Sequence, residues 1–570
     1  MLRTFNQHDI RNTFSLDGWW DFVTERDRKQ SRGLPSKFPR QAYIPCAWES
    51  IPGLESYRGR AWFRTKVPGE SGTAMRLVFG GVSHTGTVYV NKEKIGSHYD
   101  AFTPWSVLTP ECEDRDYEIV VEVDNTFGDH SALHIGNDYY TYGGITRPVD
   151  VQYVPEVYVD RMAAVPRKKG KEWDLDISIS LKNWSEKKLT RSLRFFLQDT
   201  ELDLGNVTVA AGGERQLSGR MTGLTVREWS VESPHLHEIT ALVFDRDQVV
   251  DDLTDRVGFR EVRVRGNKIL CNGKPIRLRG YNRHEDHPHY GCAIPVESMV
   301  QDLNIIRDLG CNFVRTCHYP NDERFLDLCD EMGLYVWEES HARHVDFNHP
   351  AYPKQIEDST REMITRHVNH PSIIIWGTLN ECEARTASGR KEHARILNLM
   401  RKLDDSRPVT FADNTYEKNQ CAGLVDIVSW NIYTGWYGDM RPDQAEDRLK
   451  QMLKWLKSPK SKGGKGKPVI ISEFGAGAIY GNRNPSRVRW TEEYQAEILD
   501  HALKTYLNHP AVSGAAIWQF ADCRVTEENE WWFRRPRTYN NKGTVDEYRR
   551  PKLCYEIVKK RMKDAQTRDK

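Results

Sequence analysis

The first part of the chain, to about residue 155, alternates apolar and polar side chains with a period of two. In YEIVVEVD (residues 117–124) every second residue is apolar, and acidic residues fill most of the positions between them. Val88 and Val90 alternate around Tyr89, and Asn91-Lys92 follows as a turn. A period of two is typical of a strand that buries one face. Short strands with glycine and proline between them, and no helical stretch, predict an all-β sandwich over residues 1–155.

A second β segment is expected over residues 156–262. LDISISL (residues 175–181) shows the same alternation. A length of roughly 100 residues is typical of an immunoglobulin-like sandwich. The cysteine pair of antibody domains is absent from this segment, so only the architecture is predicted.

From residue 263 the pattern changes to short apolar runs that alternate with helical segments. Strands are expected at residues 275–280, 313–316, 335–338, 372–376, 409–412, 427–430, 469–472 and 515–519. Between the first two, one helical stripe is formed by Val296, Met299, Val300, Leu303 and Ile306. Gly310 supplies its C-terminal stop. Alternating strands and helices predict a parallel sheet.

Eight such units in roughly 300 residues match a (β/α)₈ TIM barrel, which we predict for residues 263–570. The alternative is a doubly wound open sheet, but no glycine-rich phosphate loop follows any of the strands. A chain of 570 residues is too long for one hydrophobic core, which agrees with a multidomain protein.

Charge and cysteine usage exclude some classes of binding partner and indicate the cellular compartment. Lys+Arg is 82 and Asp+Glu is 81, so no net field attracts nucleic acid or an anionic membrane. The 11 cysteines are an odd number without C-x-x-C pairs, so neither a disulfide framework nor a zinc module is expected. The N-terminus has no signal-peptide pattern and no apolar run spans a bilayer. We therefore expect a cytoplasmic protein.

Polar and aromatic residues follow the predicted strands, at the end of a TIM barrel where active sites lie. They include residues 282–286 and 315–319, Glu338, Glu339, Asn380, Glu381, Asn431, Tyr433, Glu473 and Trp518. Glu381 and Glu473 follow the fourth and seventh strands, which face each other across a barrel. Retaining glycoside hydrolysis needs two carboxyl groups about 5–5.5 Å apart, one of them protonated. These two glutamates are therefore the predicted catalytic pair.

Other interpretations apply to the neighbouring residues. Glu338, Glu339 and Glu383 are expected to be ion-pair partners. His284 and His318 are either hydrogen-bonding groups of the rim or part of the site, and Trp518 is either core or a stacking surface for a sugar. The histidines and glutamate of residues 284–289 lack a known zinc spacing, so no metal is expected.

Motifs along nearly the whole chain resemble glycoside hydrolase family 2 and, within it, the bacterial β-glucuronidases. The two β segments carry LDGWWDF (16–22), RAWFRTKV (60–67), YGGITRPV (142–149) and VGFREVRV (257–264). The barrel segment carries NRHEDH, RTCHYP, HPSIIIWGTLNE and ISEFGAG. The resemblance implies a jelly-roll domain, an immunoglobulin-like domain and a catalytic TIM barrel.

By the same resemblance Glu381, in LNE, is the acid/base and Glu473, in SEFG, is the nucleophile. Asn380 would hydrogen-bond the 2-hydroxyl of the sugar. Further pocket positions are Tyr433, Tyr437, His284, Arg315 and Trp518. The implied chemistry uses carboxylates and water, so no cofactor is expected, and family members are often homo-oligomers.

Two matches imply a uronide substrate, with β-D-glucuronides as the first choice. Asn540 and Lys542 fit the N-x-K pattern by which β-glucuronidases hold the sugar carboxylate, and Asp138 matches the aspartate that reaches the 4-hydroxyl. Residues 339–370 are shorter than in relatives whose loop closes over small aglycones, so oligosaccharide glycosides are possible substrates. Arg343 departs from the glucuronidase pattern; it would assist carboxylate binding or favour an axial 4-hydroxyl, which means β-D-galacturonides. The remaining alternatives are a β-galactosidase and a carbohydrate-binding protein without catalysis.

Overall fold

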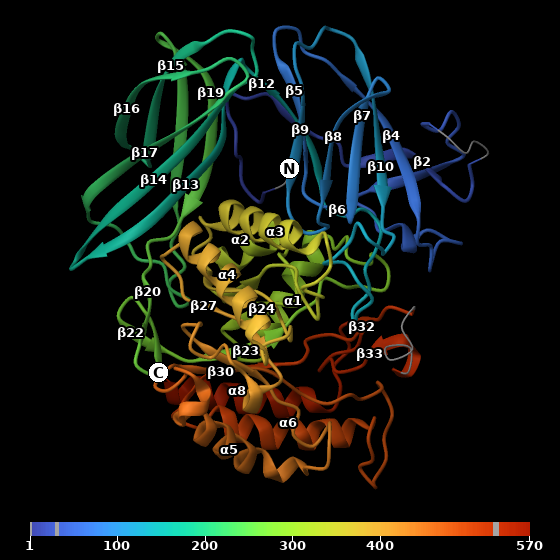
Figure 1. The fold of residues 1–570 in the computed structure, drawn as a ribbon, viewed down its shortest axis with the longest axis vertical. Helices are drawn as coiled ribbons and strands as arrows, with labels where there is room; N and C mark the ends of the chain where they lie inside the picture. The colour runs from blue at the N-terminus through green and yellow to red at the C-terminus, as the bar shows by residue number, and fades with distance from the viewer. Residues whose placement is uncertain (1–2, 29–32, 528–534, 570) are drawn as a thin grey trace.

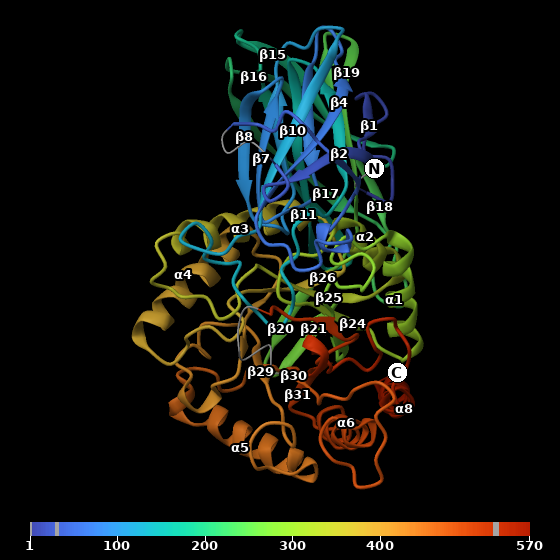
Figure 2. The same cartoon turned by 90° about the vertical axis from the view of Figure 1, so that its right-hand side faces the viewer.

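The computed structural model describes residues 3–28, 33–527 and 535–569. Two regions of β-sheet lie next to each other on one side of a barrel of strands and helices (Figures 1 and 2). The chain runs through the first β region (blue in Figure 1), then the second (green), and then the barrel (yellow to red). The fold is therefore two β-sandwiches followed by a TIM barrel, as predicted.

The first β region is a sandwich of antiparallel sheets. Its strands are β1 (Thr13–Ser15), β2 (Gly18–Thr24), β3 (Arg40–Ile44), β4 (Arg60–Pro68), β5 (Ala74–Phe79), β6 (Val82–Ser83), β7 (Thr85–Val90), β8 (Glu93–Tyr99), β9 (Trp105–Thr109), β10 (Asp116–Asp124), β11 (Gly144–Ile145) and β12 (Val149–Val154). The two larger sheets have the orders β3-β2-β4-β10-β7-β8 and β1-β12-β5-β9. The alternating apolar residues of β10 are buried against β5 and β12, which confirms the strand inferred from their spacing.

The second β region is also a sandwich. Its strands are β13 (Val157–Lys169), β14 (Glu172–Asn183), β15 (Leu189–Leu197), β16 (Thr200–Val209), β17 (Glu214–Leu224), β18 (His237–Asp245) and β19 (Gln248–Val257). One sheet has the order β13-β14-β17 and the other β16-β15-β18-β19. Leu175, Ile177, Ile179 and Leu181 are buried between them. The boundaries proposed at residues 155 and 262 stay predictions.

The barrel follows a small antiparallel sheet of β20 (Val262–Arg265), β21 (Lys268–Cys271) and β22 (Lys274–Ile276). The barrel strands are β23 (Leu278–Asn282), β24 (Phe313–Thr316), β25 (Tyr335–Glu339), β26 (Ile373–Gly377), β27 (Val409–Thr410), β28 (Ala412–Asp413), β29 (Val428–Asn431), β30 (Val469–Phe474) and β31 (Val512–Ile517). They pair in parallel in the order β27-β26-β25-β24-β23-β31-β30-β29-β28. Because β27 and β28 are separated by one residue only, the two ends of this order meet and the ring is nearly closed.

The first and last barrel strands were misplaced by the sequence pattern. Lys274–Ile276, which overlaps the start of the expected strand 275–280, belongs to the antiparallel hairpin with β21, and the barrel strand begins at Leu278. The last strand runs over Val512–Ile517 instead of 515–519. In both places the local run of residues suits a strand, and the pairing partner decides which residues belong to it.

Helices cover the outside of the barrel. They are α1 (Val296–Asp308), α2 (Glu323–Met332), α3 (Tyr352–His367), α4 (Ala387–Leu403), α5 (Ala445–Lys457), α6 (Glu492–Tyr506) and α8 (Cys554–Asp569). Short 3₁₀ segments are η1 (Trp48–Ser50), η2 (Tyr416–Lys418), η3 (Pro442–Gln444), η4 (Pro459–Ser461) and η5 (Pro536–Thr538). Near the C-terminus β32 (Cys523–Arg524) pairs with β33 (Tyr539–Asn540). The predicted helical stripe lies on α1, with Met299, Leu303 and Ile306 fully buried.

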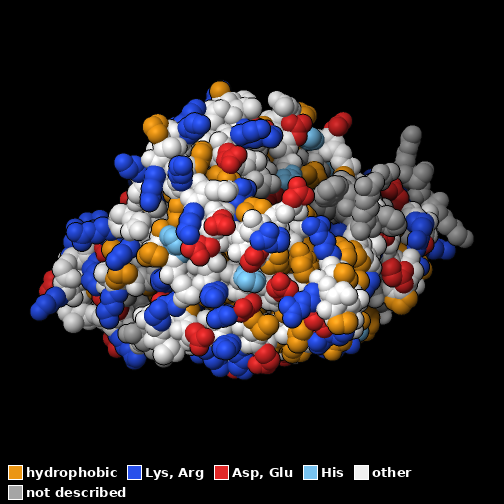
Figure 3. All heavy atoms as spheres, turned by 90° about the horizontal axis from the view of Figure 1, so that it is seen from below, with side chains coloured by type: hydrophobic (Ala, Val, Ile, Leu, Met, Phe, Trp, Pro, Cys, Tyr) orange, Lys and Arg blue, Asp and Glu red, His pale blue; other side chains and the backbone are white. Residues whose placement is uncertain are grey.

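The surface has no single sign of charge on the face drawn in Figure 3. Basic and acidic side chains are mixed over most of that face, in keeping with a formal net charge of +1. None of the helices in the described residues has both the length and the apolar character needed to cross a lipid bilayer.

Candidate active site

A cavity of about 530 Å³ opens at the carboxyl ends of the barrel strands. Its lining includes Asp138, Arg343, Glu381, Tyr433, Tyr437, Glu473 and Lys542, all predicted site residues. Asp138 comes from the loop between β10 and β11, so the first sandwich contributes to a site that is otherwise built from the barrel. The structure thus brings together residues that are up to 404 positions apart, from Asp138 to Lys542.

Glu473 lies in β30 and is 4% exposed. One carboxylate oxygen, Oε1, accepts a hydrogen bond from Arg315 Nη1 at 2.9 Å. The other, Oε2, accepts one from the hydroxyl of Tyr433 at 2.7 Å. Each oxygen therefore has one donor, and the plane of the carboxylate is held in one orientation.

Arg315, in β24, connects the groups around Glu473. It is completely buried, and its guanidinium forms two hydrogen bonds to Glu339, at 3.0 and 2.8 Å. It also donates to the side-chain oxygens of Asn282 at 2.8 Å and Asn380 at 2.9 Å. With its oxygen accepting from Arg315, Asn380 presents an amide nitrogen that has no hydrogen-bond partner among the described residues.

Glu381 follows β26 in a turn with a left-handed backbone, φ 51°. The turn is held by hydrogen bonds from Asn380 N to Ala342 O and from Glu381 N to Ala412 O, both 2.9 Å. The carboxylate accepts from Asn431 Nδ2 at 2.8 Å and contacts His344 Nε2 at 2.9 Å. A left-handed conformation at a non-glycine residue is sparsely populated and recurs at functional sites.

The two glutamates are close enough to affect each other's proton affinity. Burial and the negative charge of Glu381 raise the pKa of Glu473 to about 7, although Arg315 and Tyr433 oppose the rise. Burial also disfavours the charged form of Glu381, but the hydrogen bond from His344 and the charge of Arg343 outweigh it and lower the pKa. Asn431 lies between them, since it donates to Glu381 and its backbone pairs with that of Glu473.

Basic side chains surround Asp138 in the cavity. Asp138 pairs with Arg343 Nη1 and with Arg535 Nη2, each at 2.9 Å. Arg343 Nη2 also lies 3.9 Å from Glu381 Oε2. Burial opposes the charge of Asp138, but these two cations, with Lys542, hold its pKa far below the usual range.

Lys542 is 2% exposed and lies over the rings of Tyr433 and Tyr437, 5.7 and 5.4 Å from their centroids. In the described part of the chain it forms no ion pair of its own. Burial and the charge of Arg535 lower the pKa of Lys542. A buried ammonium without a carboxylate partner is costly, and an anionic ligand would relieve that cost.

The remaining predicted residues lie beneath the cavity. Asn540 donates to Asp138 Oδ2 at 3.1 Å, so its amide is engaged by protein instead of free for a sugar carboxylate. Trp518 is 1% exposed and stacks on His318 at 5.0 Å. His284 lies edge-on to Trp518 and has an Nε2 without a hydrogen-bond partner among the described residues. Its pKa is lowered to about 3, chiefly by burial.

The ion pairs expected for Glu339 and Glu383 are confirmed. Glu339 binds Arg315, and Glu383 pairs with Arg385 at 2.8 Å. Glu338 instead contacts the ring of His367 at 3.0 Å. Residues 284–289 form no metal-binding cluster within the described residues. Glu285 instead pairs with Arg147 at 2.8 Å.

Two residues of the site were missing from the predicted set. They are His344, which contacts Glu381, and Arg535, which pairs with Asp138. Asn431, which donates to Glu381, was expected at the rim because it follows a predicted strand. His344 and Arg535 lie in loops whose course no local pattern predicts.

Comparison with known proteins identifies the family. The model for "Glycosyl hydrolases family 2, TIM barrel domain" matches residues 262–567, and that for "Glycosyl hydrolases family 2" matches residues 157–260. A β-glucuronidase of Streptococcus agalactiae is 28% identical over 97% of this chain and 96% of its own length. A crystal structure of a GH2 β-galacturonidase from Eisenbergiella tayi bound to galacturonate is 42% identical, covers 99% of both chains and has a TM-score of 0.93. A β-glucuronidase from Ruminococcus gnavus in complex with D-glucuronic acid is 26% identical over 98% of this chain and 99% of that one, with a TM-score of 0.83. By its sequence and its architecture, this chain belongs to glycosyl hydrolase family 2 and is a glycoside hydrolase.

Proposed function

We propose that the protein removes terminal β-D-uronic acid residues from glycosides with retention of configuration. The observation that carries this proposal is the buried carboxylate pair, Glu381 and Glu473, in a cavity that is also lined by Lys542, Arg343 and Arg535. A pair of carboxyl groups suits glycoside hydrolysis, and the cations suit a sugar that carries a negative charge at C6.

The contacts of the two glutamates favour different roles. Glu473 is held on both oxygens by Arg315 and Tyr433, which suits a nucleophile that must be ionised and correctly oriented. Glu381 contacts His344, whose side chain is 37% exposed, so it lies on the solvent side where an aglycone would leave. We therefore assign Glu381 as the acid/base and Glu473 as the nucleophile.

The pKa values of the free site run against these roles, because Glu473 holds a proton more strongly than Glu381. Below about pH 7 the pair carries one proton, and the productive form is the one with that proton on Glu381. A substrate whose aglycone displaces His344 removes the donor that lowers the pKa of Glu381. Substrate binding is thus expected to move the shared proton toward the leaving group.

In the first step the Glu381 carboxyl gives its proton to the glycosidic oxygen as the C1–O bond breaks. The Glu473 carboxylate forms an ester bond to C1 and the aglycone leaves as an alcohol. In the second step Glu381, now a carboxylate, takes a proton from water; the water oxygen attacks C1 and the Glu473 carboxylate is released. The unpartnered amide of Asn380 is suited to donate to the 2-hydroxyl, a contact that strengthens in the transition state.

Among uronides we place β-D-galacturonides first and β-D-glucuronides second. The two sugars differ at the 4-hydroxyl, the group expected at Asp138. Here Asp138 is paired with Arg343, the residue that departs from the glucuronidase pattern. The greater identity to the E. tayi β-galacturonidase, 42% against 28% for the S. agalactiae and 26% for the R. gnavus β-glucuronidase, supports the same order. The N-x-K pattern at Asn540 and Lys542 keeps glucuronides as the second candidate.

The test compares kcat/KM on chromogenic β-galacturonide, β-glucuronide, β-galactoside and β-glucoside. A large preference for both uronides supports the proposal. Preference for a neutral glycoside contradicts the role proposed for Lys542, Arg343 and Arg535, which is to bind a negatively charged sugar. Glu473→Ala is expected to abolish turnover, and added azide should then give an α-glycosyl azide. A Glu473→Ala variant that keeps wild-type activity would rule out Glu473 as the nucleophile.

A further inference from the structure

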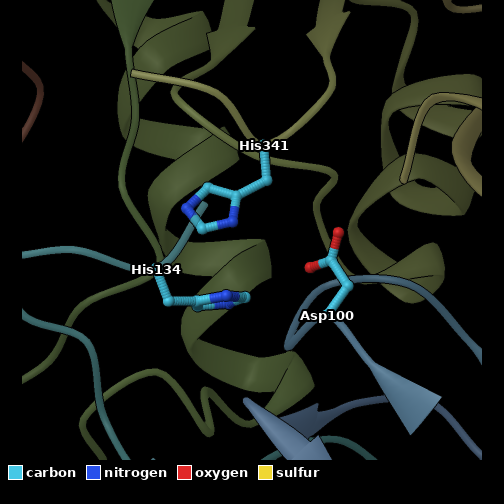
Figure 4. A group of neighbouring side chains, drawn as sticks. All are labelled: Asp100, His134 and His341. Carbon is cyan, nitrogen blue, oxygen red and sulfur yellow. The ribbon is translucent and has the colours of Figure 1, made fainter. Parts of the chain in front are cut away.

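Three buried side chains meet where the first sandwich contacts the barrel, outside the sugar cavity. Asp100 follows β8, His134 lies in the loop before β11, and His341 lies in the loop after β25. Figure 4 shows them pointing toward one another from these three segments. One ligand atom of each lies within 4.8 Å of the others, and each residue is 1% exposed.

Two of these three residues have a polar atom without a hydrogen-bond partner among the described residues. They are Nδ1 of His341 and Oδ2 of Asp100. The Ser359 hydroxyl lies beside the Asp100 carboxylate as a donor, although the pair does not reach full hydrogen-bond geometry. Most buried polar atoms in proteins are paired, so adjacent unpaired ones are suited to hold a water molecule or an ion.

Both ring nitrogens of His134 have hydrogen-bond contacts, and the one at Nε2 is long, since the backbone N–H of Ala101 donates to it from 3.4 Å. The hydroxyl of Ser131 donates to the carbonyl of His134 at 2.8 Å, and the hydroxyl oxygen of Tyr99 accepts from the backbone N–H groups of Leu133 and His134 at 3.1 and 3.2 Å. Nδ1 of His134 contacts the same Tyr99 hydroxyl at 2.9 Å. A metal ion on Nε2 would replace the contact with Ala101, the longest of these hydrogen bonds.

The chemistry of the three groups is that of a divalent metal site. His134 and His341 are buried imidazoles, and in the neutral form each offers one ring nitrogen to a metal ion. His341 contacts the hydroxyl of Tyr139 through Nε2 at 3.1 Å, which leaves Nδ1 as the inward atom. Ligating histidines usually have such a partner on the other nitrogen.

A second group of similar composition does not have these properties. Asp327, Asp330 and His370 also lie within 4.8 Å of one another. There His370 binds Asp330 at 2.6 Å, and Asp327 is paired with Arg3 at 2.7 Å. That cluster is an ion-pair network, in which each of the three side chains has a charged or ionisable side-chain partner.

We propose that Asp100, His134 and His341 bind one Zn²⁺ ion, which joins the first sandwich to the barrel. Two imidazoles and a carboxylate supply three ligands, and the fourth position of a tetrahedral ion takes a water molecule. None of the three residues lines the sugar cavity, so the ion stabilises the structure instead of acting on substrate. His341 is close in sequence to Arg343, and its contact Tyr139 is next to Asp138. The ion therefore also restrains the part of the cavity that Arg343 and Asp138 line. The proposal replaces the sequence-based expectation that no metal binds, and it does not depend on the proposed substrate.

The test measures zinc in the full-length protein. After chelator treatment and dialysis, added Zn²⁺ should rebind at one ion per chain and raise the melting temperature. Asp100→Asn and His341→Gln should each weaken binding by at least roughly 100-fold, beyond the about 10–100-fold caused by residues that only orient a ligand. His370→Gln is the matched control, since it removes a buried histidine from the other cluster and should retain the zinc.

A second measurement is independent of whether the variants fold. Anomalous diffraction at the zinc edge from wild-type crystals grown with Zn²⁺ should give a peak between the three side chains. No peak there, or zinc binding by Asp100→Asn and His341→Gln with unchanged affinity and stoichiometry, would overturn the proposal.

Discussion

Replacing Lys542 with methionine tests the recognition of the sugar carboxylate. Methionine has nearly the same length and removes only the ammonium, which is buried over Tyr433 and Tyr437 and has no ion pair in the described structure. Because Lys542 is buried, a C6 carboxylate bound to it would lose its charged partner and stay buried.

The magnitude follows from that burial. Removing one partner of a buried, hydrogen-bonded charge pair costs about 2–5 kcal/mol. Expressed as transition-state stabilisation, this is a loss of roughly 30- to 5,000-fold in kcat/KM on uronides. A neutral galactoside has no carboxylate to lose, so its kcat/KM should stay within a few-fold of wild type or rise. The melting temperature should not fall, because an unpaired buried cation is removed.

The assay compares kcat/KM for chromogenic β-galacturonide and β-galactoside in wild type and Lys542→Met. Arg448→Met serves as the matched control, since Arg448 lines the same cavity but lies over Tyr416, away from Lys542. The control should change both substrates by a similar factor. Equal losses on the uronide and the neutral glycoside in Lys542→Met would refute the carboxylate role.

Three further predictions concern the pair of glutamates and the sugar hydroxyls. The active form of the pair carries one proton, so kcat/KM should fall as pH rises through the value of about 7 at which the pair loses it; a profile flat to pH 9 would contradict this. It should fall again at acid pH, below the ordinary range of a glutamate, because the pKa of Glu381 is lowered. Arg343→Ala removes a charged donor beside Asp138, and a hydrogen bond to such a donor contributes about 1.5–3 kcal/mol. The ratio of kcat/KM on the galacturonide to that on the glucuronide should therefore drop roughly 10- to 150-fold. An unchanged ratio would show that Arg343 does not select between the two sugars. Asn380→Ala should lower kcat more than it raises KM, and a 2-deoxy substrate should show no further loss in that variant if Asn380 binds the 2-hydroxyl.

The order of the domains and most of the barrel strands could be read from the sequence. Phe313–Thr316 was predicted at both ends, because its apolar run is flanked by polar residues and every residue of the strand is buried. The expected strand 275–280 was wrong because residues before Arg277 pair with β21 and residues after it pair with β24. Which strand a residue joins therefore depends on partners that are distant in sequence.

Some residues of the candidate site could likewise be predicted from the sequence, and others could not. Glu381, Glu473 and the residues that follow the other strands were found because parallel strands bring their carboxyl ends to one rim. Asp138 and Lys542 were found only through motifs that resemble the family. His344 and Arg535 were not found, since nothing in their neighbourhood indicates where their loops lead.

The sequence by itself determined the two sandwiches, the barrel and the position of two glutamates at its rim, because these follow from local periodicity and from the geometry of parallel strands. Only the tertiary structure decided that Arg343 and Arg535 pair with Asp138, and that Asp100, His134 and His341 converge at the contact of sandwich and barrel. Those arrangements join segments more than 200 residues apart. Their distances and proton affinities come from burial and packing between elements, which no local pattern of residues encodes.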